Sequence, residues 1–293
     1  MNRKYVLTDD CITVDGRQLH RIECARFFRS LYPGAPGGYI EHEGNLSHDC
    51  DAWVADDAMV MGDAVVEDDA LVVGNACVRG EARISGNALI YGNAIVSDRA
   101  IIKDNSKVKD RAQISGYAQV YGKAWISGYA QVDDYAMVYG NAQVSGNARI
   151  SGDAEVCGGA LVTGNAEVSE TAEVFGNAFL YGAARIGDKA RVNGNAHIGG
   201  DALVSRCIDY LNIGNLYRKS NVNGNSYSVT AFVTENKTIR VVHAPSLIEL
   251  PYPPVTIEEF EAEVEKVYGA TDFIDQYRAV VSLIKAWKQI ALR

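Results

Sequence analysis

Several features that mark membrane, metal-binding or disulfide-linked proteins are missing from this sequence. No stretch approaches the ~18 uninterrupted apolar residues of a membrane-spanning helix, and the first residues, MNRKYVLTDDC, lack the apolar core of a signal peptide. The six cysteines show no CxxC or CxxH spacing, which argues against disulfide and zinc sites. We therefore expect a cytoplasmic protein with reduced thiols, no metal and no membrane association.

Dense runs of Lys and Arg are missing as well. The formal net charge is -9, so direct binding of nucleic acid in a basic groove is not expected. Residues 41–70 contain ten Asp or Glu and no Lys or Arg. This acidic segment could face a basic partner or metal ions, or mimic a nucleic acid. A solvated surface next to turn-forming aspartates is the alternative.

The sequence does contain a six-residue repeat. Ala recurs at every sixth position over 26 hexads from residue 52 to residue 202, with Ser106 as the exception. Two residues after each of these positions stands Val or Ile, except for Leu180. Two residues before, the 26 positions hold Gly 17 times and Asp seven times, with Cys50 and Glu170 as the exceptions. No residue is inserted or deleted in this stretch.

Each column of the repeat has a physical explanation. Val or Ile between variable residues is typical of a short strand with one buried face. Gly or Asp tolerates left-handed backbone angles, so each strand ends in a tight bend. One such unit cannot bury its aliphatic residue alone, and therefore copies must stack into a solenoid. Three sides per turn give 18 residues per coil and about nine coils from 26 hexads.

These hexads resemble the hexapeptide-repeat superfamily of left-handed parallel β-helices. Within it, the segment GGYIEHEGNLSHDCDAWVADDAMVMGDA and the Gly-Asn-Ala hexads resemble the YdcK-like group of acyltransferase type, over residues 1 to about 205. The resemblance implies a left-handed coil, a homotrimer, and an acyl-CoA donor lying between neighbouring subunits. One departure is visible: the superfamily places Gly directly after the aliphatic residue, whereas Ser, Tyr, Glu or Arg stands there in this chain.

The sequence predicts three parts: a β-hairpin cap (1–43), the β-helix (44–206) and an α+β domain (207–293). The fold class is therefore mainly β. Asp-Gly at residues 15–16 favours a hairpin turn in the cap, and residues 235–237 lie between two predicted strands. Thr256 and Glu259 form a capping box that starts a helix, which Gly269 ends, and Thr271 opens a second helix. This end resembles a module found behind hexapeptide solenoids in phage and prophage proteins.

The two helices have apolar stripes that are expected to be core. The first stripe consists of Ile257, Phe260, Val264, Val267 and Tyr268. The second consists of Phe273, Tyr277, Val280, Val281, Ile284, Trp287 and Ala291.

Two histidines are candidate general bases, because acyltransferases that this sequence resembles use a His on the acceptor. His48 stands at the first coil, and His197 follows Ala196 and should point outward near the last coil. Neither histidine is next to an inserted loop, and the absence of such loops argues against an enzyme. A capping role for His48 and an ordinary surface position for His197 are the alternatives.

Outward-facing apolar positions form two ladders that are typical of an interface. The first ladder consists of Trp53, Leu71, Val73, Leu89, Tyr91, Trp125, Leu161, Phe179 and Tyr181, with Lys107 and Lys109 within it. The second consists of Tyr121, Tyr139, Cys157 and Phe175. Self-association, cover by the chain's own terminal domains, and simple exposure are the three explanations.

Three functional hypotheses follow. The first is a non-catalytic scaffold, phage- or prophage-associated, that assembles through the solenoid and contacts host or phage proteins through its C-terminal domain or acidic side; it needs no cofactor. The second is an acyl-CoA-dependent acyltransferase that uses His197 or His48. The third is an anti-defence inhibitor that occupies a host protein with its acidic side.

Overall fold

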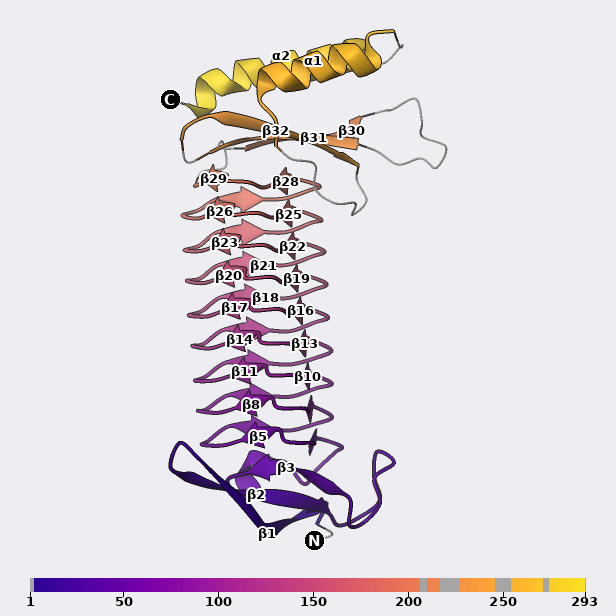
Figure 1. Cartoon of the computed structure of the whole chain (residues 1–293), viewed down its shortest axis with the longest axis vertical. Coiled ribbons are helices and arrows are strands. Elements are labelled where there is room, and N and C mark those ends of the chain that lie inside the picture. Colours follow the sequence, from indigo (N-terminus) through magenta and orange to yellow (C-terminus); the bar gives the residue numbers. More distant parts are fainter. Residues whose placement is uncertain are drawn as a thin grey trace. The chain divides into compact units, whose positions relative to one another are not determined.

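Figure 1 shows the protein as a computed structural model. It describes residues 3–205, 210–216, 227–234, 236–245, 254–270 and 274–292. The chain divides into two compact units, Met1–Asp153 and Ala154–Arg293. The predicted boundary between residues 206 and 207 lies outside the described residues.

Antiparallel strands open the first unit. They are β1 (Tyr5–Val14), β2 (Arg17–Cys24) and β3 (Pro36–Ile40), followed by the 3-10 helix η1 (Glu43–Asn45). Val14 pairs with Arg17 across the predicted hairpin. Between them Asp15 and Gly16 have φ angles of 50° and 77°, as a tight two-residue turn requires. β3 pairs antiparallel with β2 and parallel with the first coil, so the hairpin extends one side of the solenoid.

The hexads of the first unit form coils with three sides, which are seen edge-on in Figure 1. The β4 side contains β4 (Trp53–Val54), β7 (Leu71–Val72), β10 (Leu89–Ile90), β13 (Lys107–Val108), β16 (Trp125–Ile126) and β19 (Gln143–Val144). The β5 side contains β5 (Met59–Val60), β8 (Cys77–Val78), β11 (Ile95–Val96), β14 (Gln113–Ile114), β17 (Gln131–Val132) and β20 (Arg149–Ile150). The β6 side contains β6 (Val65–Val66), β9 (Arg83–Ile84), β12 (Ile101–Ile102), β15 (Gln119–Val120) and β18 (Met137–Val138).

Neighbouring strands on a side are parallel and pair residues 18 positions apart, as with Leu71 and Leu89. The Ala column and the Val or Ile column are buried throughout. Ser106, the polar exception, is buried too, and its Oγ donates to the carbonyl of Lys103 at 2.7 Å. The predicted three-sided coil with an aliphatic interior is therefore confirmed.

Every hexad bends at its Gly or Asp position. All 26 residues of this column have φ between 49° and 74°, including Cys50 and Glu170. Glycine adopts this left-handed backbone conformation freely, and among the other residues Asp and Asn adopt it at the lowest energetic cost. The prediction that each strand ends in a left-handed bend is confirmed.

Aspartates at these corners also tie one coil to the next. Asp56 Oδ2 accepts a hydrogen bond from the backbone N–H of Gly74, 18 residues later, at 3.1 Å. The same bond, at 2.9 to 3.1 Å, joins Asp68 to Gly86, Asp98 to Gly116, Asp104 to Gly122, Asp110 to Gly128 and Asp134 to Gly152. The amide of a corner residue is thus a place where a carboxylate oxygen binds.

The second unit begins with further coils of the same kind. Its three sides contain β22 (Leu161–Val162), β25 (Phe179–Leu180) and β28 (His197–Ile198); β21 (Glu155–Val156), β24 (Glu173–Val174) and β27 (Arg191–Val192); and β23 (Glu167–Val168), β26 (Arg185–Ile186) and β29 (Leu203–Val204). Counted along the chain, the hexads form about nine turns of a parallel β-solenoid. The left hand of the coil stays a prediction from the resemblance.

The second unit also contains an α+β part. It consists of β30 (Tyr210–Leu216), β31 (Tyr227–Val233), β32 (Ile239–Pro245), α1 (Ile257–Tyr268) and α2 (Ile274–Ala291). The strands form an antiparallel sheet in the order β30-β31-β32, which confirms the predicted strand pair around residues 235–237. β31 and β32 lie against β28 and β29 of the last coil, where Ala202 bridges to Thr234.

The helices pack their apolar stripes against this sheet. Thr256 Oγ1 accepts from the N–H of Glu259 at 3.1 Å, and the Glu259 carboxylate accepts from the N–H of Thr256 at 2.7 Å, so the capping box is confirmed. The described stripe residues of α2 are buried. Val267 is an exception on α1: it was expected in the core, but it lies at the edge of the stripe and is 44% exposed. Thr271 and Phe273 lie outside the described residues.

Candidate functional sites

His48 lies in the first unit under the N-terminal strands. Its ring stacks on Tyr5 at a centroid distance of 4.3 Å, and its Nδ1 accepts from the N–H of Lys4 at 3.3 Å. Nε2 is buried and has no partner among the described residues. Burial lowers the pKa of His48. These contacts are those of a residue that holds the cap in place.

Lys4 next to it is a buried cation that the sequence patterns did not reveal. Its side chain is inaccessible to solvent, and Nζ donates to the carbonyl of Asp49 at 3.4 Å over the ring of Phe28. Burial lowers the pKa of Lys4 to about 8. Because no solvent reaches the amine, it has no access to an external substrate.

His197 points out of its coil, as predicted, but it is not on the surface. The side chain is buried, it packs edge-on against Phe179 at 5.7 Å, and its backbone N–H donates to Thr230 Oγ1 on β31 at 3.0 Å. Burial lowers the pKa of His197, and Nδ1 has no partner among the described residues. The sheet that contains β31 therefore lies against His197, and the imidazole cannot reach an acceptor substrate as a general base must.

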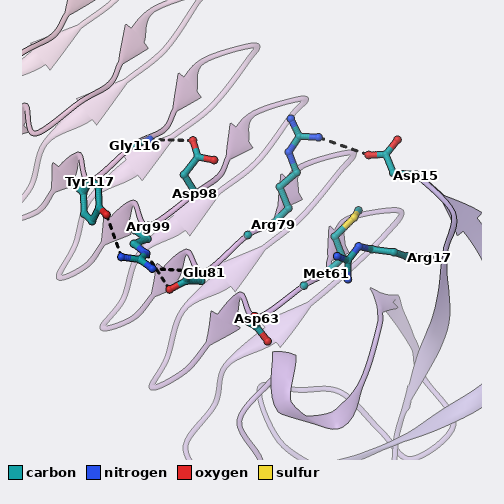
Figure 2. A pocket seen from close by; sticks show the side chains of 12 residues that line it. Asp15, Arg17, Met61, Asp63, Arg79, Glu81, Asp98, Arg99, Gly116 and Tyr117 are labelled. Carbon is teal, nitrogen blue, oxygen red and sulfur yellow. Dashed lines mark hydrogen bonds and ion pairs between the residues drawn. The ribbon is translucent and has the colours of Figure 1, made fainter.

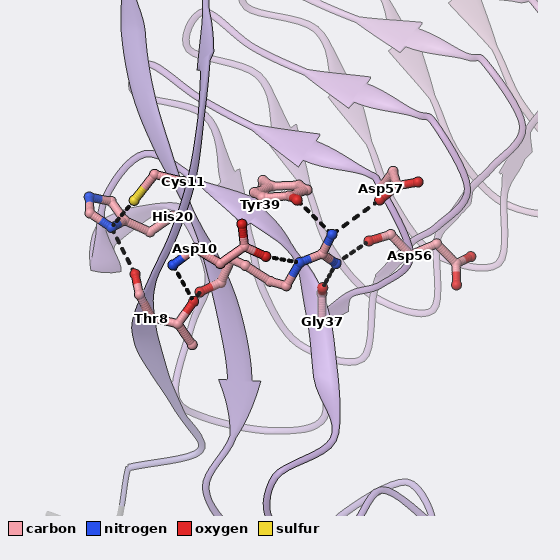
Figure 3. Close-up of polar contacts among 9 residues, drawn as sticks. Thr8, Asp10, Cys11, His20, Gly37, Tyr39, Asp56 and Asp57 are labelled. Atoms are coloured by element: carbon pink, nitrogen blue, oxygen red, sulfur yellow. Dashed lines mark hydrogen bonds and ion pairs between the residues drawn. The ribbon is translucent and has the colours of Figure 1, made fainter.

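A cysteine and a histidine meet on the hairpin, a pairing the sequence analysis missed. Cys11 Sγ lies 3.2 Å from His20 Nδ1, and the same nitrogen lies 3.1 Å from the carbonyl oxygen of Thr8 (Figure 3). Because a carbonyl can only accept, Nδ1 carries the proton and cannot withdraw one from the thiol. The pair therefore lacks the arrangement of an activated nucleophile.

Part of the acidic segment 41–70 is paired within the first unit. Arg21 donates to Asp57 at 3.3 Å and to the Tyr39 hydroxyl at 2.6 Å, near the site drawn in Figure 3. Glu41 and Glu43 pair with Arg17 and Arg3, and Asp56 and Asp68 bind corner amides. The segment is therefore not a continuous unpaired acidic face, although the cap that supplies its arginines was predicted only as a cover.

The first ladder runs along the β4 side in the first unit. Trp53 is buried, because Tyr5 and Phe28 of the cap pack edge-on against its ring. The next coils expose part of an apolar surface formed by Leu71, Val73, Leu89 and Tyr91. Trp125, two coils further on, is 39% exposed. The cap thus covers one end of the ladder and leaves the rest open.

One coil of basic residues lies directly below one coil of aromatic residues, a pattern that the 18-residue spacing could have revealed. Each cation lies 5.1 to 5.6 Å from the ring above it. The pairs are Arg99 with Tyr117, Lys103 with Tyr121, Lys107 with Trp125 and Arg111 with Tyr129. The predicted stack of Tyr121 on Tyr139 is present at 4.9 Å, and Tyr117 stacks on Tyr135 in the same way.

The ladder residues of the second unit have different surroundings. Phe179 and Tyr181 are buried next to His197, and Leu161 and Cys157 are partly exposed. Arg191 lies over the ring of Phe175 at 5.5 Å. Phe179 thus packs against Tyr181 and against His197, whose N–H binds Thr230 of β31. Cover of this ladder by the chain's own terminal domains stays a prediction.

A groove of about 490 Å³ lies in the first unit between the hairpin tip and a column of corners (Figure 2). The hairpin contributes Asp15 and Arg17, and successive coils contribute Gly62, Gly80, Asp98 and Gly116 with their neighbours. Arg99 donates to Glu81 and to the Tyr117 hydroxyl, each at 3.0 Å. Arg79 Nη1 lies 3.6 Å from Asp15 Oδ2, which is longer than a hydrogen bond. The sequence analysis did not predict this groove, because the groove forms only where the hairpin lies over coils that are distant from it in the sequence.

Two stretches of the chain, residues 82–98 and 142–158, match the family model described as the YdcK Beta solenoid repeat. These hexads are similar to the YdcK repeat. No curated protein matches the chain. The match supports the predicted resemblance of the repeats to the YdcK type, and the protein is a β-solenoid repeat protein. The acyltransferase grouping and the phage-type C-terminal module stay predictions.

The YdcK-type match covers hexads and leaves out the hairpin that completes the groove. No cluster of His, Cys, Asp or Glu among the described residues has the arrangement of a metal site. The described helices include none that is long and apolar enough to cross a membrane.

Proposed function

We propose that this protein is a non-catalytic binding scaffold that assembles with copies of itself through the β4 side. The observation that carries this proposal is the partly exposed apolar surface of Leu71, Val73, Leu89 and Tyr91. Leu71 pairs with Leu89 one coil on, and Val73 and Tyr91 also stand 18 residues apart, so the surface repeats along the solenoid. Apolar patches of this kind on soluble proteins are typical of interfaces.

A second copy of this chain is the occupant that fits this surface. Its coils have the same strand spacing of ~4.8 Å, so outward side chains of two copies meet in register over several coils. A trimer is the arrangement that the resemblance implies. Trp125, which is exposed beyond Lys107 and Lys109, extends the surface.

The helices supply a second contact surface in this proposal. Leu283 and Ile290 on α2 are 49% and 55% exposed, and they stand seven residues apart, so they share one face of the helix. Val267 on α1 is also exposed. We assign the protein partner of the scaffold, in a phage or prophage setting and in the cytoplasm, to this face.

The observed contacts do not favour acyl transfer or inhibition through an acidic face. His197 is covered by β31, and His48 holds the cap. Acetyl-CoA calorimetry tests the first alternative: micromolar binding that is lost in His197→Ala would replace the scaffold with an enzyme. A stoichiometric host protein that co-purifies through the acidic segment would instead support the inhibitor.

Light scattering tests the assembly. We expect a mass near three chains for the native protein and a single chain for Leu89→Glu, because a charge cannot be buried unpaired in an apolar interface. Gln131→Glu is the matched control, since Gln131 is the outward residue of the β5 side. A native protein that stays monomeric at all concentrations would remove the interface.

A further inference from the structure

Carboxylate oxygens occupy the corner amides of the first unit at many places. The side-chain oxygens of six aspartates accept a hydrogen bond from the glycine N–H one coil further on, as with Asp98 and Gly116 at 3.1 Å. In each case an aspartate lies below and a glycine lies above. The corner amide is therefore a repeated oxyanion-binding position in this fold.

Gly62 shows that the carboxylate can also come from outside the column. Its N–H donates to Glu41 Oε2 at 2.7 Å, and Arg17 Nη1 donates to both Glu41 oxygens at 2.9 and 3.0 Å. The Gly62 amide first, and then Arg17, lower the pKa of Glu41. One corner amide and one arginine thus stabilise a negatively charged carboxylate.

One coil further on, a corner amide and an arginine again line the groove, but the amide binds no carboxylate of the described residues. The Gly80 N–H has no acceptor among the described residues, because Gly62 below it has no side chain to supply one. A Cβ placed on Gly62 would lie 3.0 Å from the oxygen and 3.3 Å from the nitrogen of Gly80. A side chain in that position would therefore lead directly to the vacant amide.

The arginine of this position is Arg79. Its guanidinium is about half exposed, and its one ion pair, with Asp15 on the hairpin, is long at 3.6 Å. Both Arg79 and Gly80 line the groove (Figure 2). The other acids of the lining are mostly bound: Glu81 pairs with Arg99, and Asp98 binds the Gly116 amide. Asp63 is exposed to solvent.

We propose that this groove binds a small carboxylate, whose oxygens accept hydrogen bonds from the Gly80 N–H and the Arg79 guanidinium. The two places share a corner amide and an arginine, but Arg17 comes from the hairpin and Arg79 precedes Gly80 in the coil. Asp15 competes for Arg79 in the unliganded protein. The site lies away from the β4 side and is independent of the proposed assembly.

Amide NMR on protein labelled with ¹⁵N-glycine tests the site, with sodium propionate as the probe and sodium chloride at equal ionic strength as the control. We expect the Gly80 amide proton to move downfield and to saturate. The Gly62 amide, which is already bound to Glu41, should move little. The Gly92 amide is a second internal control, because it stands above Gly74 outside the groove.

Substitutions separate binding from structure. Gly62→Asp should place an internal carboxylate at the Gly80 amide and abolish propionate binding; circular dichroism checks that the variant stays folded, because the Glu41 carboxylate already binds the amide of this corner. Gly176→Asp makes the same change outside the groove, at a corner that has glycine in the coil below and in the coil above, and should leave binding intact. Arg79→Gln should weaken binding about tenfold or more. Asp15→Asn should tighten it, because the competing carboxylate is removed.

The proposal fails if the Gly80 amide shows no saturable shift with propionate. It also fails if folded Gly62→Asp binds propionate as well as the native protein does. Inorganic phosphate serves as the competing probe: tighter binding of phosphate than of propionate would show that the class of ligand is wrong.

Discussion

Trp53 and Trp125 occupy the same column of the β4 side, yet one is buried and the other is exposed. Each residue of this column pairs in register with the one in the next coil, in the order Trp53, Leu71, Leu89, Lys107 and Trp125. Trp53 is 2% exposed because the cap covers it, and Trp125 is 39% exposed above two lysines. The hexad therefore determines only that these side chains point outward, and the elements around the coil determine whether water reaches them.

The difference between the two tryptophans can exist only if the coils that carry them are folded, and the buried Val or Ile column holds those coils together. Val144→Asp should cost roughly 4 kcal/mol or more, because an unpaired charge would replace a fully buried side chain. Gln143→Asp, at the exposed neighbouring position, should stay within about 0.5 kcal/mol. Thermal unfolding followed by circular dichroism measures both. Equal melting temperatures for Val144→Asp and the native protein would contradict the solenoid itself.

Replacing each tryptophan tests the comparison directly. Trp53→Ala should destabilise the protein by about 3 to 5 kcal/mol through the cavity it leaves under the cap. Trp125→Ala should cost about 1 kcal/mol or less, which is the loss of its contacts with Lys107 and Lys109. Chemical denaturation of the two variants gives the difference. Similar losses would show that something also covers Trp125, and if Trp125→Ala changes the mass in light scattering, a second copy is that cover.

His197 is a buried residue of the second unit, and its burial should affect stability less than the burial of Trp53 does. Burial holds the folded-state pKa below the ordinary 6.5, so the unfolded chain takes up the proton first as the pH falls. Its contribution to stability is complete above pH 6.5 and is lost as the pH drops through the lowered pKa. His197→Gln should therefore reduce the loss of stability between about pH 7 and pH 5. Melting curves at several pH values check this, and an unchanged acid dependence would contradict a buried neutral imidazole.

The sequence predicted the coil well because its cause is local. Each hexad contains its own bend, its own small corner residue and its own inward aliphatic side chain, and no insertion disturbs the register. The capping box at Thr256 and the stripe of α2 are local in the same sense. The burial of Trp53 and His197, and the groove at Gly80, depend on contacts between segments far apart in the sequence, which periodicity does not encode. The row of cations below aromatic rings was visible in the 18-residue spacing, but it is found only when outward columns are compared coil by coil.

The corner bonds between aspartate and glycine have a consequence for how such a chain can change its length. Duplication or loss of 18 residues keeps the hexads in phase, yet each of the six observed aspartates binds the amide of a glycine one turn later. Excision of residues 111–128 would bring Asp134 to the place that Gly116 holds above Asp98, so two like charges would meet at a crowded bend. Recombination between coils is thus restricted to junctions that preserve this alternation, and the spacing of acids along the repeats records which junctions those are.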